Sequence, residues 1–261
     1  MESTKTQPIV ELQDVRKEYR QGHLEVQAVN GIDLTIQAGE FTAICGPSGS
    51  GKTTLLNLIG CLDTPTKGRV LVGGRDVSSL SDSALADLRL RQIGFVFQAY
   101  NLVPVLTAFE NVELVLALQG VPAAARKKRV LSILEEVGLL ELRDRRPMDM
   151  SGGQQQRVAV ARAVVANPRL VLADEPTANL DSHTGAALLQ MMADLNREHQ
   201  VTFLFSTHDP MVMDYSRRIV RIVDGKISTD EIKARGAGDR APEGAGDRAP
   251  EGAGDRAPEE A

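Results

Sequence analysis

The chain has 261 residues, of which 42% are hydrophobic and 25% charged, which suits one globular domain with a substantial core. The net charge is −5, and residues 236–261 supply −4 of it with seven acidic residues and three arginines. The rest is nearly neutral and lacks the basic stripe that a nucleic-acid backbone requires, so we expect no nucleic-acid partner. Aromatic residues make up 3%, without Trp, which argues against a base-stacking platform.

The two cysteines, Cys45 and Cys61, each lie in an apolar stretch with no Cys or His at metal-ligand spacing, which indicates buried free thiols. The N-terminal residues lack the apolar segment of a signal peptide, and no apolar run approaches the ~18 residues needed to cross a bilayer. We therefore expect a cytosolic protein whose membrane role would need a separate partner.

The first part of the chain predicts strands. Residues 9–19 and 24–36 alternate apolar and polar side chains, as half-buried antiparallel strands do, and residues 41–45 form a short apolar run suited to a central strand. A Gly-rich turn follows, and then an apolar stretch that predicts a helix over residues 54–62.

That turn, residues 46–53, reads GPSGSGKT and matches a phosphate-binding pattern in the required place, after a strand and before a helix. Its backbone N–H groups are donors for phosphate oxygens, Lys52 adds a positive charge at the β- and γ-phosphates, and the Thr53 hydroxyl can ligate Mg²⁺. A Gly-rich turn that merely precedes a lysine is the rarer alternative. The expected nucleotide-binding residues here are Gly46, Pro47, Ser48, Gly49, Ser50, Gly51, Lys52, Thr53 and Thr54.

A helical insertion is predicted next. The apolar run at residues 93–97 predicts a buried strand, after which residues 98–150 carry only helical patterns, including residues 108–119 and 122–137. Pro122 suits a first helical turn and Gly138 suits a C-cap. We expect a helical subdomain over about residues 99–160, inserted into the sheet.

The run MSGGQQQR, residues 150–157, precedes a predicted helix over residues 158–166. Ser151 with Gln154 three residues later fits a capping box, so the simplest interpretation is a well-capped helix start. The two glycines between them leave backbone N–H groups accessible to a phosphate. This segment would then be a second anion-binding site.

Two carboxylates, Asp174 and Glu175, follow an apolar strand at residues 170–173. Strand alternation would point them in different directions, one toward a Mg²⁺ ion and the other toward an attacking water, although such a pair alone is usually a polar strand end. Further apolar runs at residues 201–205 and 219–223 complete a mostly parallel sheet with helices on both faces. His208 follows the first of these runs, at the sheet edge where ligands bind.

The end of the chain is repetitive. Residues 236–259 are three identical copies of Gly-Ala-Gly-Asp-Arg-Ala-Pro-Glu without any large apolar residue, which predicts a disordered tail, a repeat-encoded binding function being the alternative. The expected organisation is therefore a flexible N-terminus over residues 1–7, one domain over 8–235 and a tail over 236–261.

These motifs, in this order, resemble those of ATP-binding cassette (ABC) ATPases over about residues 8–230, which implies a P-loop NTPase core with an N-terminal antiparallel β subdomain. Residues 46–53 look like the Walker A motif, 170–175 like Walker B, 151–154 like the signature and 178–181 like the D-loop. Gln98 looks like the Q-loop residue, His208 the H-loop residue, and Tyr19 the aromatic A-loop residue that stacks on adenine.

Residues 57–66, 97–104 and 107–112 further resemble the LolD/MacB branch, which serves lipoprotein release and macrolide or peptide export. Met150 replaces the usual Leu of the signature, a volume-conserving change. The resemblance implies an ATPase that works as a homodimer with an integral membrane permease and a periplasmic adaptor, at the cytoplasmic face of the inner membrane. Residues 98–112 are expected to contact the permease.

The resemblance also implies residue roles. The implied catalytic residues are Glu175, His208, Lys52 and Gln98. The implied Mg²⁺ ligands are Thr53, Gln98 and Asp174. The implied ATP contacts outside the GPSGSGKT run are Tyr19, Ser151, Gly153, Gln154 and Asp181, with Ser151 and Gly153 closing over the γ-phosphate bound by a second subunit.

Two other functions are alternatives to transport. ABC ATPases of DNA repair carry a very long coiled coil between the Q-loop and the signature, whereas Gln98 and Ser151 are 53 positions apart. An ATP-driven regulator of a transmembrane signalling or cell-division complex, which moves no solute, stays open as an alternative.

Overall fold

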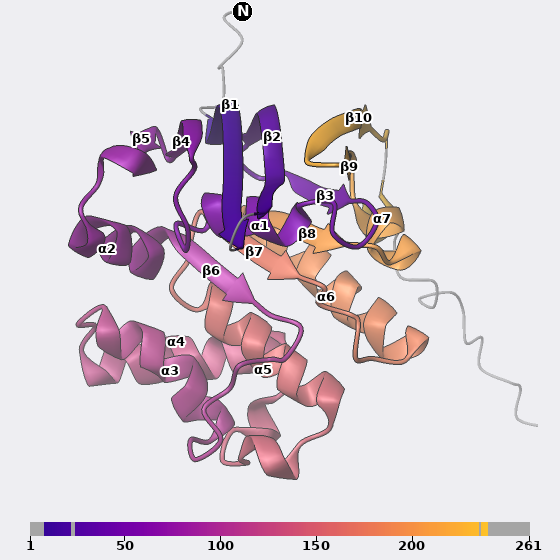
Figure 1. Ribbon diagram of the computed structural model, residues 1–261. Helices are drawn as coiled ribbons and strands as arrows, with labels where there is room; N and C mark the ends of the chain where they lie inside the picture. The colour runs from indigo at the N-terminus through magenta and orange to yellow at the C-terminus, as the bar shows by residue number, and fades with distance from the viewer. Residues whose placement is uncertain (1–7, 22–23, 235, 240–261) are drawn as a thin grey trace, which may run out of the picture.

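The computed structural model describes residues 8–21, 24–234 and 236–239, which form two sheets with helices packed around them (Figure 1). The antiparallel sheet has the order β2-β1-β4-β5. Its strands are β1 (Pro8–Gln21), β2 (Leu24–Gln37), β4 (Lys67–Val72) and β5 (Arg75–Asp76). The strands expected at residues 9–19 and 24–36 are thus confirmed as an antiparallel pair.

The second sheet has the order β10-β9-β3-β8-β7-β6 and is parallel except for β10. Its strands are β3 (Phe41–Cys45), β6 (Ile93–Val96), β7 (Leu170–Asp174), β8 (Thr202–Thr207), β9 (Arg218–Val223) and β10 (Lys226–Ile232). This confirms the predicted mostly parallel α/β core. The strand β10 was not predicted, because its side chains are mostly exposed and polar and carry no apolar run.

Helix α1 (Lys52–Ile59) contacts strands of both sheets and buries Leu55, Leu58 and Ile59 between them. The prediction of a helix over residues 54–62 was wrong at both ends. The helix begins directly at the glycine turn, and it stops where Cys61 turns into the left-handed region with a φ of 57°.

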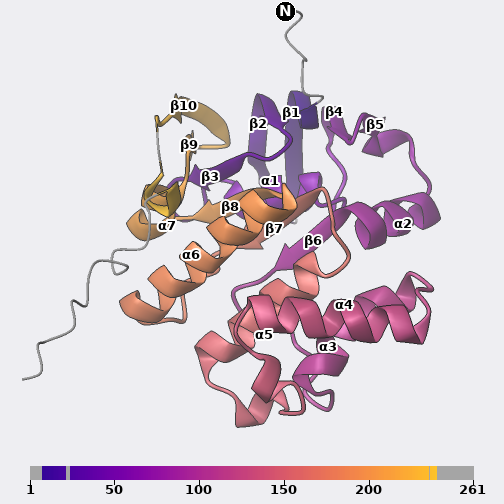
Figure 2. The ribbon, with the colours of Figure 1, turned by 180° about the vertical axis from the view of Figure 1, so that it is seen from behind.

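The opposite face of the parallel sheet carries α6 (Ser182–His199) and α7 (Pro210–Tyr215), while α3 (Ala108–Leu118), α4 (Ala123–Glu136) and α5 (Gly152–Val164) gather beside it (Figure 2). Phe41, Phe203 and Phe205 are fully buried in the core that these helices share with the sheet. Short 3₁₀ turns, η2 (Leu140–Leu142) and η3 (Pro147–Asp149), connect α4 to α5.

Several helix ends differ from the predictions. Helix α5 begins at Gly152 rather than at residue 158, because the Ser151 cap starts the helix at once. Pro122 is the N-cap of α4, with a ψ of 144°, rather than a residue of its first turn, whereas Gly138 follows the C-cap with a φ of 71° as expected. Helix α2 (Asp82–Gln92) was not identified, since it buries only Leu88 and its apolar pattern is weak.

The start of the repeat tail also differs from the prediction of disorder over residues 236–261. Ala237–Asp239 form a 3₁₀ turn, η4, which contacts α6 and α7, because the two glycines of the first repeat let the chain approach these helices. Residues 1–7, 22–23, 235 and 240–261 lie outside the described residues, so the flexible N-terminus over residues 1–7 and the disorder of residues 240–261 stay predictions.

Both cysteines are buried free thiols, as predicted. The helices that the structure describes include none long and apolar enough to cross a membrane.

Candidate functional site

The GPSGSGKT turn lies between β3 and α1, and its glycines are required by close packing. A Cβ atom on Gly46 would lie 2.1 Å from the Ile222 carbonyl oxygen, and one on Gly51 would lie 2.1 Å from the Ala28 carbonyl oxygen. Gly51 also has a φ of 100°, which favours glycine strongly. The turn is therefore fixed in shape by backbone contacts with the neighbouring strands.

Lys52 opens helix α1 and folds its ammonium group back over the turn. Its Nζ donates to the carbonyl oxygens of Gly46 at 2.9 Å and Pro47 at 3.0 Å. The N-cap Gly51 offers no side-chain cap and the first turn of α1 has no acidic residue, so the helix N-terminus keeps its positive end open to an anion. The turn, the helix end and Lys52 together form a cradle suited to phosphates.

Thr53 faces Asp174, which lies at the carboxyl end of β7. The Thr53 hydroxyl is 3.4 Å from each carboxylate oxygen of Asp174. A hydroxyl and a carboxylate directed at each other across a phosphate cradle are hard oxygen donors of the kind Mg²⁺ prefers.

Glu175 is turned away from Asp174, although not by the strand alternation that the sequence predicted. It lies just past the end of β7 with a φ of 46°, a conformation that a non-glycine residue rarely adopts. Its Oε1 lies 2.6 Å from Nδ1 of His208, and its Oε2 accepts a hydrogen bond from the Thr207 hydroxyl at 3.1 Å. The carboxylate is thereby held by two residues at the end of β8.

Gln98 is exposed just after β6, at the same edge of the sheet. Its carbonyl oxygen accepts a hydrogen bond from Asn179 Nδ2 at 2.9 Å, which ties the loop after β6 to the loop after β7. The structure therefore brings Lys52, Thr53, Asp174 and Glu175 together with His208, and places Gln98 on a connected loop.

The expected second anion site, at the start of α5, has the predicted capping box. Ser151 Oγ accepts from the Gln154 N–H at 3.3 Å, and Gln154 Oε1 accepts from the Ser151 N–H at 2.9 Å. A Cβ atom on Gly153 would lie 2.5 Å from Thr184 Cγ2, so this glycine permits close packing against α6.

The two candidate anion-binding sites, the GPSGSGKT turn and the start of α5, remain separate within one chain. Among the described residues, no hydrogen bond joins residues 151–154 to residues 46–54. In Figure 1, α5 lies with α3 and α4, whereas α1 lies under the antiparallel sheet.

Asp181 is the N-cap of α6. Its carboxylate accepts from the backbone N–H groups of His183 at 3.1 Å and Thr184 at 3.0 Å, and from the Thr184 hydroxyl at 2.6 Å. The hydrogen bond from the Thr184 side chain is the main reason that the pKa of Asp181 lies below its ordinary value. The structure thus gives Asp181 a local role in starting α6.

Tyr19 is 37% exposed near the end of β1, and its hydroxyl donates to Asp63 Oδ2 at 2.8 Å. Burial and the bond to Asp63 raise the pKa of Tyr19. Burial opposes ionisation of Asp63, but hydrogen bonds from Lys17 and Tyr19 outweigh it and lower the pKa of this carboxyl. The ring is therefore held in place at its hydroxyl end while part of it faces solvent.

The sequence interpretation missed two connecting residues on α5. Gln156 is fully buried, and its Nε2 donates to the carbonyl oxygen of Pro176 at 2.9 Å and to that of Phe97 at 3.5 Å. Arg162 donates to the carbonyl oxygen of Tyr100 at 2.9 Å. The only signal in the sequence was a run of glutamines after the capping box, which does not reveal which of them points inward.

A family model described as "ABC transporter" matches residues 29–178. A protein named lipoprotein-releasing system ATP-binding protein LolD, from Anaeromyxobacter dehalogenans, is 51% identical over 224 residues, which cover 85% of this chain and 94% of the relative. A macrolide export ATP-binding/permease protein MacB from Brucella melitensis is 47% identical over 226 residues, which cover 87% of this chain but 35% of that longer protein.

A solved structure described as a dimeric post-hydrolysis state of the ATP-binding cassette MJ0796 bound to ADP and Pi superimposes with a TM-score of 0.79. It is 44% identical, and the match covers 85% of this chain and 98% of that one.

Proposed function

Because the chain belongs to the ABC transporter family as an ATP-binding subunit of the LolD/MacB type, we propose that it hydrolyses ATP as a dimer coupled to a separate membrane permease. One observation carries the proposal. Two adjacent carboxylates at the end of β7 face different partners, Asp174 toward Thr53 and Glu175 toward His208. Such an arrangement separates metal binding from water activation.

The proposed binding step uses the cradle around α1. Backbone N–H groups of the turn and Lys52 hold the phosphates, and the exposed ring of Tyr19 packs on adenine. Thr53, Asp174 and Gln98 supply oxygen donors for Mg²⁺, which when bound neutralises charge on the phosphate oxygens.

The proposed chemical step uses Glu175 to orient the attacking water and accept its proton. The hydrogen bond from the Thr207 hydroxyl keeps the carboxylate directed to one side, while His208 is 71% exposed and free to meet the γ-phosphate. Lys52 and His208 then stabilise the negative charge on the transferred phosphoryl group.

The proposed dimer places the start of α5 of one subunit over the cradle of the other. The N–H groups of Gly152 and Gly153 are not used by the capping box, which employs those of Ser151 and Gln154. Residues 151–154 and 46–54 do not meet within the described part of one chain, and a related cassette forms dimers, so we infer that Ser151 and Gly153 act across the dimer interface.

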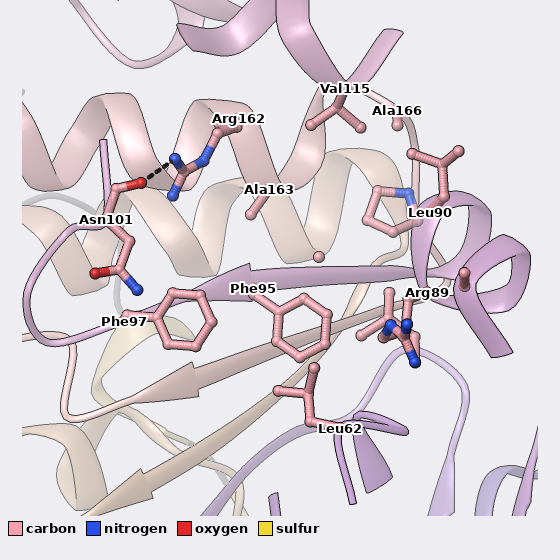
Figure 3. Close-up of a pocket in the computed structure, with 14 residues that line it drawn as sticks. Leu62, Arg89, Leu90, Phe95, Phe97, Asn101, Val115, Arg162, Ala163 and Ala166 are labelled. Atoms are coloured by element: carbon pink, nitrogen blue, oxygen red, sulfur yellow. Dashed lines mark hydrogen bonds between the residues drawn. The ribbon is translucent and has the colours of Figure 1, made fainter. Parts of the chain in front are cut away.

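The permease is proposed to dock in an apolar pocket of about 430 Å³ between α2, β6, α3 and α5 (Figure 3). The rings of Phe95 and Phe97 stack in it with centroids 5.8 Å apart, and Leu62 is 50% exposed at its edge. An apolar helix end of the permease would fill this pocket. Only Asn101 of the predicted contact range, residues 98–112, lines it, so the proposed contact extends beyond that range.

The cargo proposed for the whole transporter is a lipoprotein, peptide or macrolide that is exported, on the strength of the LolD-named and MacB-named relatives. The subunit would then work at the cytoplasmic face of the inner membrane. The periplasmic adaptor stays a prediction.

The test is the Glu175→Gln variant, studied by phosphate release and by light scattering after gel filtration. We expect ATP binding to persist, hydrolysis to fall about 10²-fold or more, and the variant to become a dimer with saturating ATP. Glu141→Gln, an exposed residue in η2, is the matched control and should hydrolyse ATP normally. If the Glu175→Gln variant stayed monomeric with saturating ATP, even beside its membrane partner, the proposed mechanism would have to be abandoned.

A further inference from the structure

The start of the first repeat, residues 236–239, lies on the surface of α6 and α7. After β10, the Lys233 N–H donates to the Arg217 carbonyl oxygen at 2.7 Å, and Lys233 Nζ donates to the Met213 carbonyl oxygen at 2.9 Å. These bonds direct the chain along α7, so that Gly236 and Gly238 become buried.

The surface accepts only glycine at these two positions. A Cβ atom on Gly236 would lie 2.3 Å from the backbone carbonyl oxygen of Tyr215, which cannot rotate away. A Cβ atom on Gly238 would lie 2.7 Å from Ala193 Cβ, on the body of α6. The helices thus select the pattern Gly-X-Gly by steric fit.

Two α6 side chains add a polar contact to this fit. Arg197 Nη1 donates to the Gly238 carbonyl oxygen at 2.7 Å, and Gln190 Nε2 approaches the same oxygen at 3.4 Å. Both donors also contact Asp194, which lies between them on the same face of the helix and restricts their orientation. We name the surface formed by Gln190, Ala193, Arg197 and Tyr215 the glycine seat.

The Gly-Ala-Gly segment that fits the glycine seat occurs three times in the chain. Residues 244–246 and 252–254 repeat the Gly-Ala-Gly of residues 236–238, and the five residues that follow are identical in all three copies. We propose that the glycine seat is a peptide-binding site for which all three repeats of the same chain are ligands. The second and third copies replace the first when eight or sixteen residues loop out.

The loss of chain entropy when a later copy replaces the first is small. Two residues, 234 and 235, link Lys233 to the first repeat, and ten would link it to the second. Loop-closure entropy grows only with the logarithm of length, so the second copy should occupy the seat about tenfold less than the first. Loss of the first copy is therefore expected to transfer the seat to the second.

The experiment compares two variants of the full chain by hydrogen–deuterium exchange of amides in residues 190–199 and 210–216. Gly236→Ala blocks only the first copy, and Gly236→Ala/Gly244→Ala/Gly252→Ala blocks all three. In the single variant, Gly236→Ala, we expect the amide protection factors to fall by about tenfold or less. In the triple variant they should fall at least about tenfold further. Gly244→Ala/Gly252→Ala, the matched control, should exchange like the wild type, and strand β3 should stay protected in every variant.

Equal exchange in the single and triple variants would show that only the first copy fits and would overturn the proposal. Equal exchange in the wild type and the triple variant would do the same, since the seat would then be vacant in solution. Protection of the single variant that rises with protein concentration would place the occupant on a second molecule and overturn the same-chain assignment.

A peptide measurement tests recognition separately from chain connectivity. Added to the triple variant, an acetylated octapeptide Gly-Ala-Gly-Asp-Arg-Ala-Pro-Glu should restore protection in residues 190–199 and 210–216 in a saturable way. The same peptide with Ala in place of its first Gly should not. Equal effects of the two peptides would contradict steric selection by the seat.

Discussion

The Oε1 atom of Glu175 and the Nδ1 atom of His208 lie 2.6 Å apart, although the two residues follow different strands. Strands β7 and β8 are paired in parallel, so the residues that follow them emerge at the same edge of the sheet. The Thr207 hydroxyl holds the other carboxylate oxygen. The residue proposed to activate water and the residue proposed to contact the γ-phosphate are thus linked directly.

This link predicts that His208 contributes to the chemical step rather than to ATP affinity. We expect His208→Ala to lower kcat by about 10²-fold, because His208 is proposed to stabilise charge on the phosphoryl group and to orient Glu175. The dissociation constant for ATP should stay within about threefold of the wild type by the same argument. Phosphate release and equilibrium ATP binding measure the two effects, and His183→Ala, exposed at the start of α6, serves as the control.

The proposed sharing of each active site between two subunits predicts complementation between two inactive variants. Lys52→Ala removes the charge in the phosphate cradle, and Ser151→Arg obstructs the start of α5, so each homodimer has two defective sites. A mixed dimer contains one site with an intact cradle and an intact Ser151. We expect the mixture to regain measurable ATPase activity that neither variant shows alone. If mixing restored nothing while mixed dimers were detected by mass spectrometry, each site would have to lie within one chain.

The position of Tyr19 predicts that its ring, not its hydroxyl, binds the nucleotide. Tyr19→Ala should weaken ATP binding roughly tenfold, as loss of aromatic stacking on a base does. Tyr19→Phe should bind ATP within about twofold of the wild type, since the hydroxyl is used by Asp63. Titration with a fluorescent nucleotide measures the affinity of both variants. Equal weakening by both substitutions would assign the effect to the Asp63 contact.

The buried side chain of Gln156 is expected to contribute more to stability than that of its neighbour Gln155. Gln156→Met keeps the volume but leaves the Pro176 carbonyl oxygen without its donor, which should lower the free energy of unfolding by about 1–3 kcal/mol. Gln155 is partly exposed and donates to the Met150 carbonyl oxygen, so Gln155→Met should cost about 1 kcal/mol or less. Urea unfolding measures both, and equal losses would contradict the role assigned to Gln156.

The pair formed by Arg218 and Asp230 predicts a pH dependence of stability. Arg218 Nε and Nη2 donate to the two Asp230 oxygens at 2.8 and 2.7 Å, and this bonding lowers the pKa of Asp230 below 3.8. The contribution of this pair to the free energy of unfolding is present above pH 3.8, the ordinary pKa of Asp230. It is lost as the pH falls through the lower pKa that Asp230 has in the folded state.

Asp230→Asn should therefore reduce the free energy of unfolding at pH 7 by about 1 kcal/mol at most, since the pair is partly exposed. The difference from the wild type should shrink toward pH 3. Urea unfolding at the two pH values measures it, with the exposed Asp144→Asn as control. A difference that grew on acidification would contradict the assignment.

Much of the candidate site was readable from the sequence, because its chemistry is local. The glycines of residues 46–51 and the lysine after them adjoin one another, and the Ser151–Gln154 capping box spans a single helical turn. Short-range patterns of this kind fix backbone shape and donor placement within a few residues. The antiparallel pair β1–β2 and the five parallel strands of the second sheet were likewise predicted from side-chain alternation and apolar runs, whereas β10 was not.

Contacts between distant segments required the tertiary structure. The sheet order β3-β8-β7 decides that His208 meets Glu175 and that Thr53 meets Asp174, and nothing in the local sequence states that order. The inward direction of Gln156 depends on what packs against α5, and the seat for Gly236 depends on α7 lying beside the chain after β10. Local sequence therefore determined the turns, caps and strands that carry the chemistry. Long-range packing of the sheets and helices alone decided which of these groups lie within bonding distance.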